Sequence, residues 1–483
     1  MTAAAANAPE AVPDTSGIAG HPKGLSTLFF TEMWERFSYY GMRAILILFM
    51  VTPVAAGGLG FDTVKAAGIY GLYTGSVYFT TIPGGWIADR LLGLRRAVLV
   101  GGVLIACGHY SLLLARTTQF FYAGLLLIVL GTGLLKANIS AIVGQLYVPG
   151  DPRRDAGFSI FYMGINLGGF ISPLICGGLA QKIGWHWGFG AAGVGMTLGL
   201  VQYVVGQHRF GRAGLLLAPP RGASILWAKA VGGVVLAGLG LWAVWPWRDY
   251  VVLAGTAGLF VWLLRTGADT PVERKRIGAI MVLFVFAVLF WIGFEQAGSS
   301  LTLFADQNTS NTILGWGFPS SWYQSVESFF VVSLAPVFAW LWLRLGRREP
   351  SSPAKFAYAL LSLSLGFLVI AVAAHLHAAS GSRVSPWWLI ALYFLHALGE
   401  LSLSPVGLST VTKLAPTRIV GMMMGVWFLA LSLGNFLAGT VAGFFDRLPL
   451  PQLFGSVCLT TAISGLALAL LVKPIRALMG GVH

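Results

Sequence analysis

Four charged side chains interrupt an apolar stretch near the start of the chain. Residues 25–51 are apolar enough and long enough to cross a lipid bilayer, yet they contain Glu32, Glu35, Arg36 and Arg43. An ionised group inside a membrane is costly unless it finds a partner or faces water. On a helix these side chains fall on one broad face, because residues three, four and seven positions apart return to the same side. We therefore expect that face to line a polar space.

Four further ionisable residues lie inside other apolar runs. Lys136 is in the first half of the chain, and Glu295, Glu327 and Glu400 are in the second half. Structural salt bridges would explain one such pair, but eight groups spread over both halves favour a pathway for a polar substrate. The first half holds the surplus of cations and the second half the surplus of anions. Such a cavity suits a zwitterion, whose carboxylate would meet arginine or lysine and whose ammonium would meet a glutamate.

Charge pairs of this kind can couple a substrate to protons. A carboxylate that faces a cation in a dry cavity stays ionised, and desolvation favours its protonation once the substrate's carboxylate takes the cation. Substrate and proton would then bind together, and the ion pairs that keep one side of the cavity closed would weaken. Aromatic residues expected near these charges could contact varied substrate side chains, or they could only pack against other helices. They are Tyr40, Tyr78, Trp291, Trp316 and Trp427.

The composition is that of a polytopic membrane protein. Of the 483 residues, 56% are hydrophobic and 10% are charged, whereas soluble domains have roughly 25% charged residues. The net charge of +14 would suggest nucleic acid in a soluble protein. Here the basic residues lie in short loops between apolar runs, which is typical of topology determinants, and no nucleic-acid partner is expected. The three cysteines lack metal-ligand spacing, and no cleavable signal peptide is expected.

Apolar runs of about 20 residues predict an all-α fold with two sets of six spanning helices. The first set lies near 25–52, 63–88, 96–115, 119–147, 156–180 and 187–207, and the second near 277–304, 320–344, 355–376, 386–412, 419–444 and 451–473. Runs near 224–245 and 250–265 predict two inserted helices, which makes 14 helices. The expected organisation is a tail (1–22), a six-helix bundle (23–209), the inserted pair (210–271), a second bundle (272–476) and a tail (477–483).

Lysine and arginine gather on one side of this scheme. By the positive-inside rule, both termini of this multi-pass protein are expected to be cytoplasmic. Two repeated halves favour a substrate site at mid-membrane between them. Residues 84–96, echoed in part by residues 343–348, resemble the loop signature of the major facilitator superfamily. Within that loop, Asp89 could pair with arginines and take part in gating, or the loop could only set topology.

Four motifs resemble those of the proton-dependent oligopeptide transporters, a family with the major facilitator fold. The first is Glu-x-x-Glu-Arg-Phe-x-Tyr-Tyr-Gly at residues 32–41, and the others lie at 161–168, 294–300 and 399–409. Bacterial members of the family also have two inserted helices between the halves. The resemblance implies symport of di- and tripeptides into the cytoplasm, driven by the proton gradient with no cofactor. We expect the protein to act as a monomer in the lipid bilayer of a bacterial inner membrane.

The resemblance also implies roles for individual residues. The proton-coupling group would comprise Glu32, Glu35, Arg36, Lys136 and Glu295. The peptide site would comprise Tyr40, Arg43, Tyr78, Lys136, Asn166, Trp291, Glu295, Glu327, Glu400, Ser404 and Trp427. The gates would use the pairs Arg43 with Glu295 and Lys136 with Glu400, together with Asp89.

Glu327 departs from the family pattern, because related proteins usually carry asparagine at this position. An extra carboxylate could hold the peptide ammonium or titrate as a second proton site. Alternatively, it could be protonated and bonded to a neighbouring polar group.

Two other functions stay open at this point. One is transport of another zwitterionic or anionic molecule, since some relatives carry nitrate, although those tend to alter the Glu-x-x-Glu-Arg cluster, which is intact here. The other is a membrane-embedded enzyme. The chain lacks His-Glu-x-x-His and Gly-x-Ser-x-Gly motifs and a phosphate-binding loop, which disfavours that reading.

Overall fold

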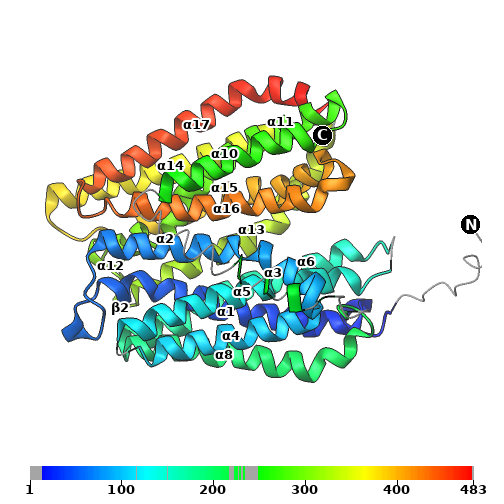
Figure 1. Cartoon of the computed structure of the whole chain (residues 1–483). Helices are drawn as coiled ribbons and strands as arrows, with labels where there is room; N and C mark the ends of the chain where they lie inside the picture. The colour runs from blue at the N-terminus through cyan, green and yellow to red at the C-terminus, as the bar shows by residue number, and fades with distance from the viewer. Residues whose placement is uncertain are drawn as a thin grey trace, which may run out of the picture.

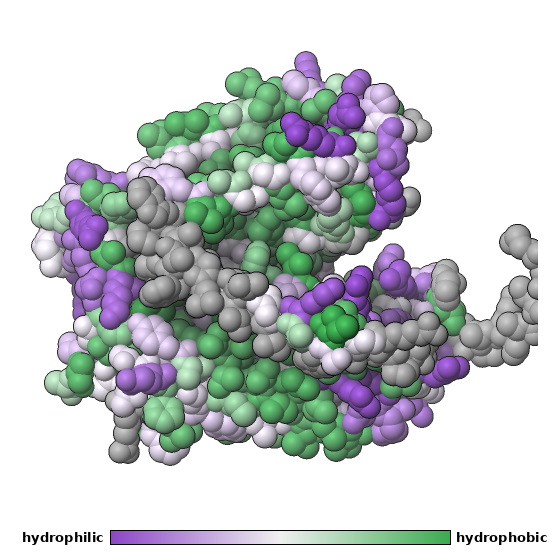
Figure 2. All heavy atoms as spheres, viewed as in Figure 1, coloured by the Kyte–Doolittle hydropathy of each residue, from purple (hydrophilic) through white to green (hydrophobic). Residues whose placement is uncertain are grey.

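The protein was analysed as a computed structural model. The structure describes residues 14–115, 117–148, 151–216, 222, 224–226, 228, 229, 232, 233 and 248–480. In these ranges the chain is almost entirely helical, and its helices form two bundles (Figure 1). Figure 2 shows a cleft between the bundles. The prediction of an all-α polytopic fold built from two helical bundles is confirmed for the described residues.

The first bundle contains the helices up to α8. Its α-helices are α1 (Lys23–Val51), α2 (Thr63–Phe79), α3 (Thr81–Ile87), α4 (Leu94–Leu113), α5 (Thr118–Gln145), α6 (Arg154–Ser172), α7 (Gly178–Lys182) and α8 (Trp185–Gly206). Helix α1 packs against α6 and α8, and α4 packs between α5 and α8. The charged helix α1 therefore lies inside its bundle, where 21 of its 29 residues are buried.

The second bundle begins at α11. Its α-helices are α11 (Pro271–Phe294), α12 (Ser300–Gln307), α13 (Tyr323–Leu345), α14 (Ser352–Ser380), α15 (Trp387–Leu414), α16 (Val420–Ala442) and α17 (Leu450–Met479). The antiparallel strands β1 (Thr312–Ile313) and β2 (Trp316–Gly317) form a small hairpin between α12 and α13. Helix α10 (Arg248–Thr266) packs against α11 and corresponds to the second predicted insertion. The first predicted insertion, near 224–245, lies mostly outside the described residues.

Short 3₁₀ and π segments join several of these helices. The 3₁₀ segments are η2 (Ile18–Gly20), η3 (Val54–Ala56), η6 (Gln207–Phe210), η8 (Glu295–Gly298), η9 (Ser320–Trp322), η10 (Gly346–Arg348) and η11 (Thr417–Ile419), and the π segments are η4 (Ala88–Leu92) and η5 (Pro173–Gly177).

Ten helical stretches of the described chain are long and apolar enough to cross a membrane. Helix α1 is not one of them, because its charged residues offset its apolar ones. This is the same property that made the stretch conspicuous in the sequence.

Three predicted continuous helices are broken in the structure. The run predicted near 63–88 is interrupted at Thr80, three residues before Pro83, and the run near 156–180 contains a π segment that starts at Pro173. Proline lacks the N–H that a helix interior needs, which explains both breaks. The run near 277–304 is broken at η8, and there Gly298 is the enabling residue. A Cβ on Gly298 would lie 1.6 Å from the Tyr70 hydroxyl oxygen, so only glycine lets the first bundle approach this backbone.

The cleft between the bundles opens at one end and is closed at the other. Figure 2 shows the opening at the end of the molecule where both described chain ends lie, with hydrophilic residues around its rim and hydrophobic residues over the lateral faces. Toward the closed end, α2 packs on α16 and α6 packs on α13, so these two pairs join the bundles. The structure therefore shows a state open to one side only.

Candidate functional site

Helix α1 holds a buried cluster of two carboxylates and one guanidinium. Arg36 Nε donates to Glu35 Oε2 and lies 3.2 Å from Glu32 Oε1, and all three side chains are at most 2% exposed. One further atom of each group, Glu32 Oε2, Glu35 Oε1 and Arg36 Nη2, is buried without a hydrogen-bond partner. One cation thus faces two carboxylates, and the cluster has carboxylate oxygens to spare for a proton.

Lys136 on α5 lies against an aromatic ring rather than a carboxylate. Its Nζ atom is 3.7 Å from the ring centroid of Tyr78 on α2, a cation–π contact. Among the described residues, no carboxylate lies within ion-pair distance of Lys136, although its charge acts on Glu32 and Glu35 from further away. A direct ion pair between Lys136 and the α1 cluster is therefore absent in this state.

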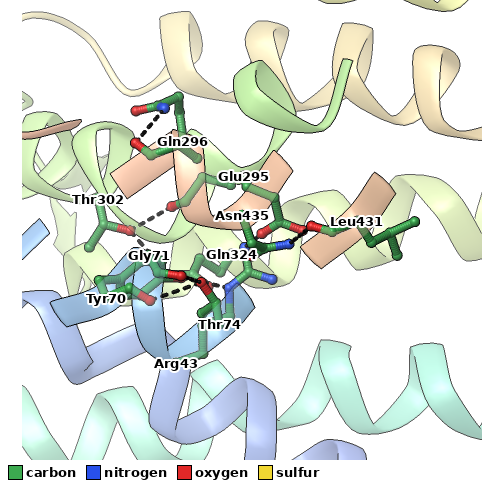
Figure 3. A network of polar contacts seen from close by, with 12 residues as sticks. Arg43, Tyr70, Gly71, Thr74, Glu295, Gln296, Thr302, Gln324, Leu431 and Asn435 are labelled. Atoms are coloured by element: carbon green, nitrogen blue, oxygen red, sulfur yellow. Dashed lines mark hydrogen bonds and ion pairs between the residues drawn. The ribbon is translucent and has the colours of Figure 1, made fainter. Parts of the chain in front are cut away.

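An ion pair between Arg43 and Glu295 connects the two bundles (Figure 3). Arg43 Nη2 lies 2.5 Å from Glu295 Oε2, and Arg43 Nε donates to the Tyr70 hydroxyl at 2.7 Å. The side chains of Arg43 and Glu295 are only 8% and 4% exposed. The arginine comes from α1, the tyrosine from α2 and the glutamate from η8, where α11 is interrupted. The predicted pair is thus present, while its role in gating stays a prediction.

Polar residues around this pair hold the interrupted helix in place. Gln296 donates to the backbone oxygens of Ile292 and Ala438, and it accepts a hydrogen bond from Ser300 at 2.6 Å. In α13, Gln324 donates to Thr302 at 3.0 Å (Figure 3). These bonds tie η8 to α16 and α12 to α13, so Glu295 is presented from a fixed backbone.

A second connection between the bundles centres on Gln181 in α7, which the sequence did not single out. Its amide nitrogen donates to Ser320 at 2.8 Å and to Asp306 at 3.3 Å. Its amide oxygen accepts from the backbone N–H and the hydroxyl of Ser321, at 3.0 and 2.7 Å. Gly177 makes room for this contact, since a Cβ there would lie 2.1 Å from Ser321 Oγ. A lone glutamine in an apolar stretch gives no signal that would have identified this latch.

Helices α2 and α16 complete the closed side through backbone contacts. A Cβ on Gly71 would lie 2.8 Å from the Cα of Gly439, and a Cβ on Gly439 would lie 2.5 Å from a backbone oxygen of α2. At the helix ends, Thr63 donates to Asp446. Hydrogen bonds donated by uncharged side chains, together with glycine contacts, therefore supplement the Arg43–Glu295 pair.

Glu400 on α15 has no ion pair in the described chain. Its side chain is half-buried, and Lys136, its predicted partner, lies on the other bundle. The predicted pair is not formed in this state, because the two bundles diverge toward the open end of the cleft (Figure 2). Glu327 on α13 is also half-buried and unpaired among the described residues, with Oε1 buried and without a donor.

The predicted aromatic contacts divide into two groups. Tyr40 is half-buried, with the guanidinium of Arg43 5.9 Å from its ring centroid. Trp291 and Trp427 are 6% and 5% exposed and pack within the second bundle. Trp316 lies in β2, is 57% exposed and contacts other aromatic rings of the hairpin region. The prediction that Trp316 lies near the central charges is wrong, because the hairpin takes it to the closed outer end.

Two polar residues of the predicted peptide site, Asn166 and Ser404, make no contact with a charged group among the described residues. Asn166 on α6 donates to the Tyr162 backbone oxygen one turn earlier at 3.1 Å. Ser404 on α15, one turn beyond Glu400, has a buried hydroxyl without a partner.

Asp89 lies in the π segment η4 and is exposed. In the described structure it forms no ion pair with the arginines of its loop. Arg95 instead donates to the backbone oxygens of Ala213 and Gly211, each at 2.6 Å. The expected pairing of Asp89 with the loop arginines is therefore absent here, and its gating role stays a prediction.

The segment before α1 is tied to the connection between α5 and α6. Arg153 pairs with Asp151 at 2.7 Å and donates to the backbone oxygen of Gly20, while His21 Nδ1 lies 2.8 Å from the Tyr147 hydroxyl. Hydrogen bonds from Arg153 lower the pKa of Asp151, and partial burial raises the pKa of Tyr147. Over the described ranges, no group of three histidine, cysteine, aspartate or glutamate residues could hold a metal ion.

Known proteins resemble the chain over almost its full length. The POT family matches residues 95–455. The peptide transporter YePEPT of Yersinia enterocolitica is 42% identical, with 95% of this chain and 96% of the relative covered. A di-/tripeptide transporter of Lactococcus lactis is 36% identical, with coverage of 96% and 98%. The crystal structure of a peptide transporter POT in complex with sulfate has a TM-score of 0.90 and 43% identity, and it covers 97% of this chain and 98% of its own. The protein therefore belongs to the POT family of membrane transporters and is not an enzyme.

Proposed function

We propose that the protein imports di- and tripeptides together with protons by alternating access. The observation that supports this most directly is the distribution of charge across the cleft. Arg43 of the first bundle pairs with Glu295 of the second bundle, and the first bundle also carries Lys136 while the second carries Glu400. A peptide has a carboxylate at one end and an ammonium at the other, so each end would find a complementary bundle.

The relatives support a peptide as the substrate. Two of them are named for di- and tripeptides or for peptides. A mutant form of the similar POT structure was solved in complex with alafosfalin, at 43% identity to this chain, and another POT transporter with a peptide conjugate, at 34% identity.

The direction of opening is inferred from the basic residues. Both described chain ends lie at the open side of the cleft (Figure 1). Helix α1 begins at Lys23, and the last turn of α17 contains Arg476, so both of these helix ends are basic. Arg153, Arg209 and Lys413 likewise lie at helix ends. By the positive-inside rule this side faces the cytoplasm, which places both termini there, in an inner membrane. The structure then corresponds to the inward-open state, in which a peptide would be released.

Proton coupling would use the unbalanced carboxylates. The α1 cluster has two carboxylates and one guanidinium, and protonation would supply the missing positive charge. Protonation of Glu295 would weaken its pair with Arg43 and free the arginine for a peptide carboxylate. The closed side could then open, while Lys136 and Glu400 approach each other on the other side. Each of these steps uses a group already present at the interface.

One observation favours a second candidate cargo. A similar POT transporter, 34% identical with a TM-score of 0.87, was solved in complex with 5-aminolevulinic acid. That compound is a zwitterion without a peptide bond, so the same charge pattern would accept it. A competition panel separates the two candidates, since a peptide transporter would be inhibited by dialanine more strongly than by 5-aminolevulinic acid.

The test is uptake of labelled dialanine into liposomes containing the purified protein. With an inward proton gradient, we expect accumulation that disappears when the gradient is collapsed. Glu295→Gln should abolish gradient-driven uptake but retain counterflow, and Lys136→Ala should impair both. Glu273→Gln provides the matched control, because Glu273 is paired with Arg418 within the second bundle and away from the cleft. Equal uptake with and without a gradient would contradict proton coupling.

A further inference from the structure

The transmembrane charges of the described helices do not balance. The carboxylates are Glu32, Glu35, Glu295, Glu327 and Glu400, and the cations are Arg36, Arg43 and Lys136. Arg36 is engaged by two carboxylates, Arg43 by Glu295, and Lys136 by an aromatic ring. Two positive charges are therefore lacking, and Glu327 and Glu400 are the two carboxylates without an ion pair.

The packing of α13 on α15 brings these two carboxylates to one place. Val331, one turn after Glu327, packs in a buried cluster with Ala397 and Leu401. Those two residues flank Glu400 on α15, so the same helix contact sets Glu327 beside Glu400. Their charges interact accordingly, and Glu400 exerts the largest electrostatic effect of any charged group on Glu327.

Among the described helices, no cation is free to neutralise this pair. The other groups that act on Glu327 are Arg43 from α1 and Glu295 from η8, and Tyr393 is its titratable neighbour on α15. Arg43 is already held by Glu295 and the Tyr70 hydroxyl. Around Glu400 the additional neighbours, Tyr40 and Tyr162, are phenols. Glu327 Oε1 lacks any donor, while the residue as a whole is partly exposed. The pair therefore faces the cleft with acceptors only.

We propose that Glu327 and Glu400 form a two-carboxylate subsite that holds two positive charges at the amino end of the cargo. The preferred cargo is then a peptide whose first residue is lysine or arginine, with the α-ammonium on one carboxylate and the side-chain cation on the other. A peptide with a neutral first residue supplies only one of these charges. This inference rests on the proposed function, since it specifies the substrate class of the same site.

Binding of isomeric dipeptides tests the subsite. The dissociation constants of Lys-Ala and Ala-Lys are measured on the purified full-length protein near pH 7.5, so that net charge is equal and only the position of the second cation differs. We expect Lys-Ala to bind about three- to tenfold more tightly than Ala-Lys, the range for one partly hydrated charge-assisted contact. In Glu327→Gln this ratio should fall to about one, whereas the control Glu273→Gln should keep it, because Glu273 is paired with Arg418.

Three outcomes would overturn the inference. They are the absence of a preference for Lys-Ala in the wild-type protein, an unchanged ratio in Glu327→Gln, and a variant that changes only the pH dependence of dialanine binding. The last would show that Glu327 takes a proton rather than a cargo cation. Because binding is measured without transport, a protein that binds Lys-Ala selectively but fails in proton-driven uptake would contradict the proposed coupling and leave the subsite supported.

Discussion

Under the proposed alternating access, the ion pair between Arg43 and Glu295 should determine how long the closed side of the cleft stays closed. Glu295→Gln removes the negative charge while keeping the size of the side chain and one oxygen acceptor. Arg43 would retain its bond to Tyr70 but would lose its charged partner on the second bundle. We therefore expect the variant to populate the outward-open state more than the wild-type protein.

The size of the effect follows from the burial of the pair. Removing one partner of a buried ion pair costs roughly 3–5 kcal/mol, but glutamine keeps a neutral hydrogen bond, which leaves a loss of about 1.5–3 kcal/mol. At about 1.4 kcal/mol per factor of ten, the equilibrium between the two states shifts by roughly ten- to 150-fold. A wild-type population of about 1% outward-open protein would rise to roughly 10–60%.

Distances between spin labels across the closed end would measure this shift. Suitable positions are Val54 in η3 of the first bundle and Leu314 in the β1–β2 turn, both exposed, in a protein without its three native cysteines. Glu295→Gln should add a longer distance to the distribution, and Glu273→Gln should not. A distribution unchanged from wild type in Glu295→Gln would refute the role of the pair as a lock.

Three other perturbations test neighbouring features. Gln181→Ala removes the hydrogen bonds of the Gln181 amide, a loss of about 1–3 kcal/mol, and should also lengthen the distance between the spin labels. This effect should not vary with pH near neutrality, because the Gln181 side chain is uncharged. Arg36→Ala leaves two buried carboxylates without a cation and should destabilise the protein by roughly 3–5 kcal/mol, visible as a lower Tm in detergent, whereas Arg36→Lys should recover part of it. Asp151→Asn should increase hydrogen exchange in residues 14–22, because Arg153 loses its partner. The pKa of Asp151 is lowered in the folded protein, so ionised Asp151 contributes its full stabilisation above the pKa of about 3.9 that it has in the unfolded chain. That stabilisation is lost as the pH falls further, so acid should have the same effect as the substitution. An unchanged label distance in Gln181→Ala, an unchanged Tm in Arg36→Ala or unchanged hydrogen exchange in Asp151→Asn would contradict the corresponding prediction.

Much of the fold follows from one-dimensional properties of the chain. Apolar run length predicts the positions of the spanning helices, since a bilayer has one thickness and each helix must cross it. The interruption of α11 at η8 could not be predicted in this way. It depends on Gly298 meeting Tyr70 and Arg43 from the other bundle, a contact between segments far apart in sequence.

The residues of the candidate site also divide into those that the sequence reveals and those that only the structure reveals. Charged residues in apolar runs are conspicuous, so the members of the Arg43–Glu295 pair and the α1 cluster were identifiable before their geometry was known. Gln181 was not, because a neutral amide is common in helices and only its four hydrogen bonds, to Asp306, Ser320 and Ser321, reveal its use. The predicted Lys136–Glu400 pair is not formed in this structure, where the two residues lie on different bundles. Its formation in another conformation stays a prediction.

Polar contacts across the closed side support the proposal of alternating access. They include the Arg43–Glu295 ion pair, the bonds of Gln181, the bond from Thr63 to Asp446, the bonds from Ser432 to Gly75 and from Trp322 to Leu174, and close glycine contacts between α2 and α16. Apolar side chains of both bundles also belong to one buried cluster. Each polar contact is worth about one to a few kcal/mol, and several can be replaced by water when the side opens. A transporter needs two states that differ by only a few kcal/mol, so that proton and cargo binding can reverse their order. The polar contacts of the closed side therefore match the unbalanced charges of the cleft, since both make the conformational equilibrium responsive to what binds between the bundles.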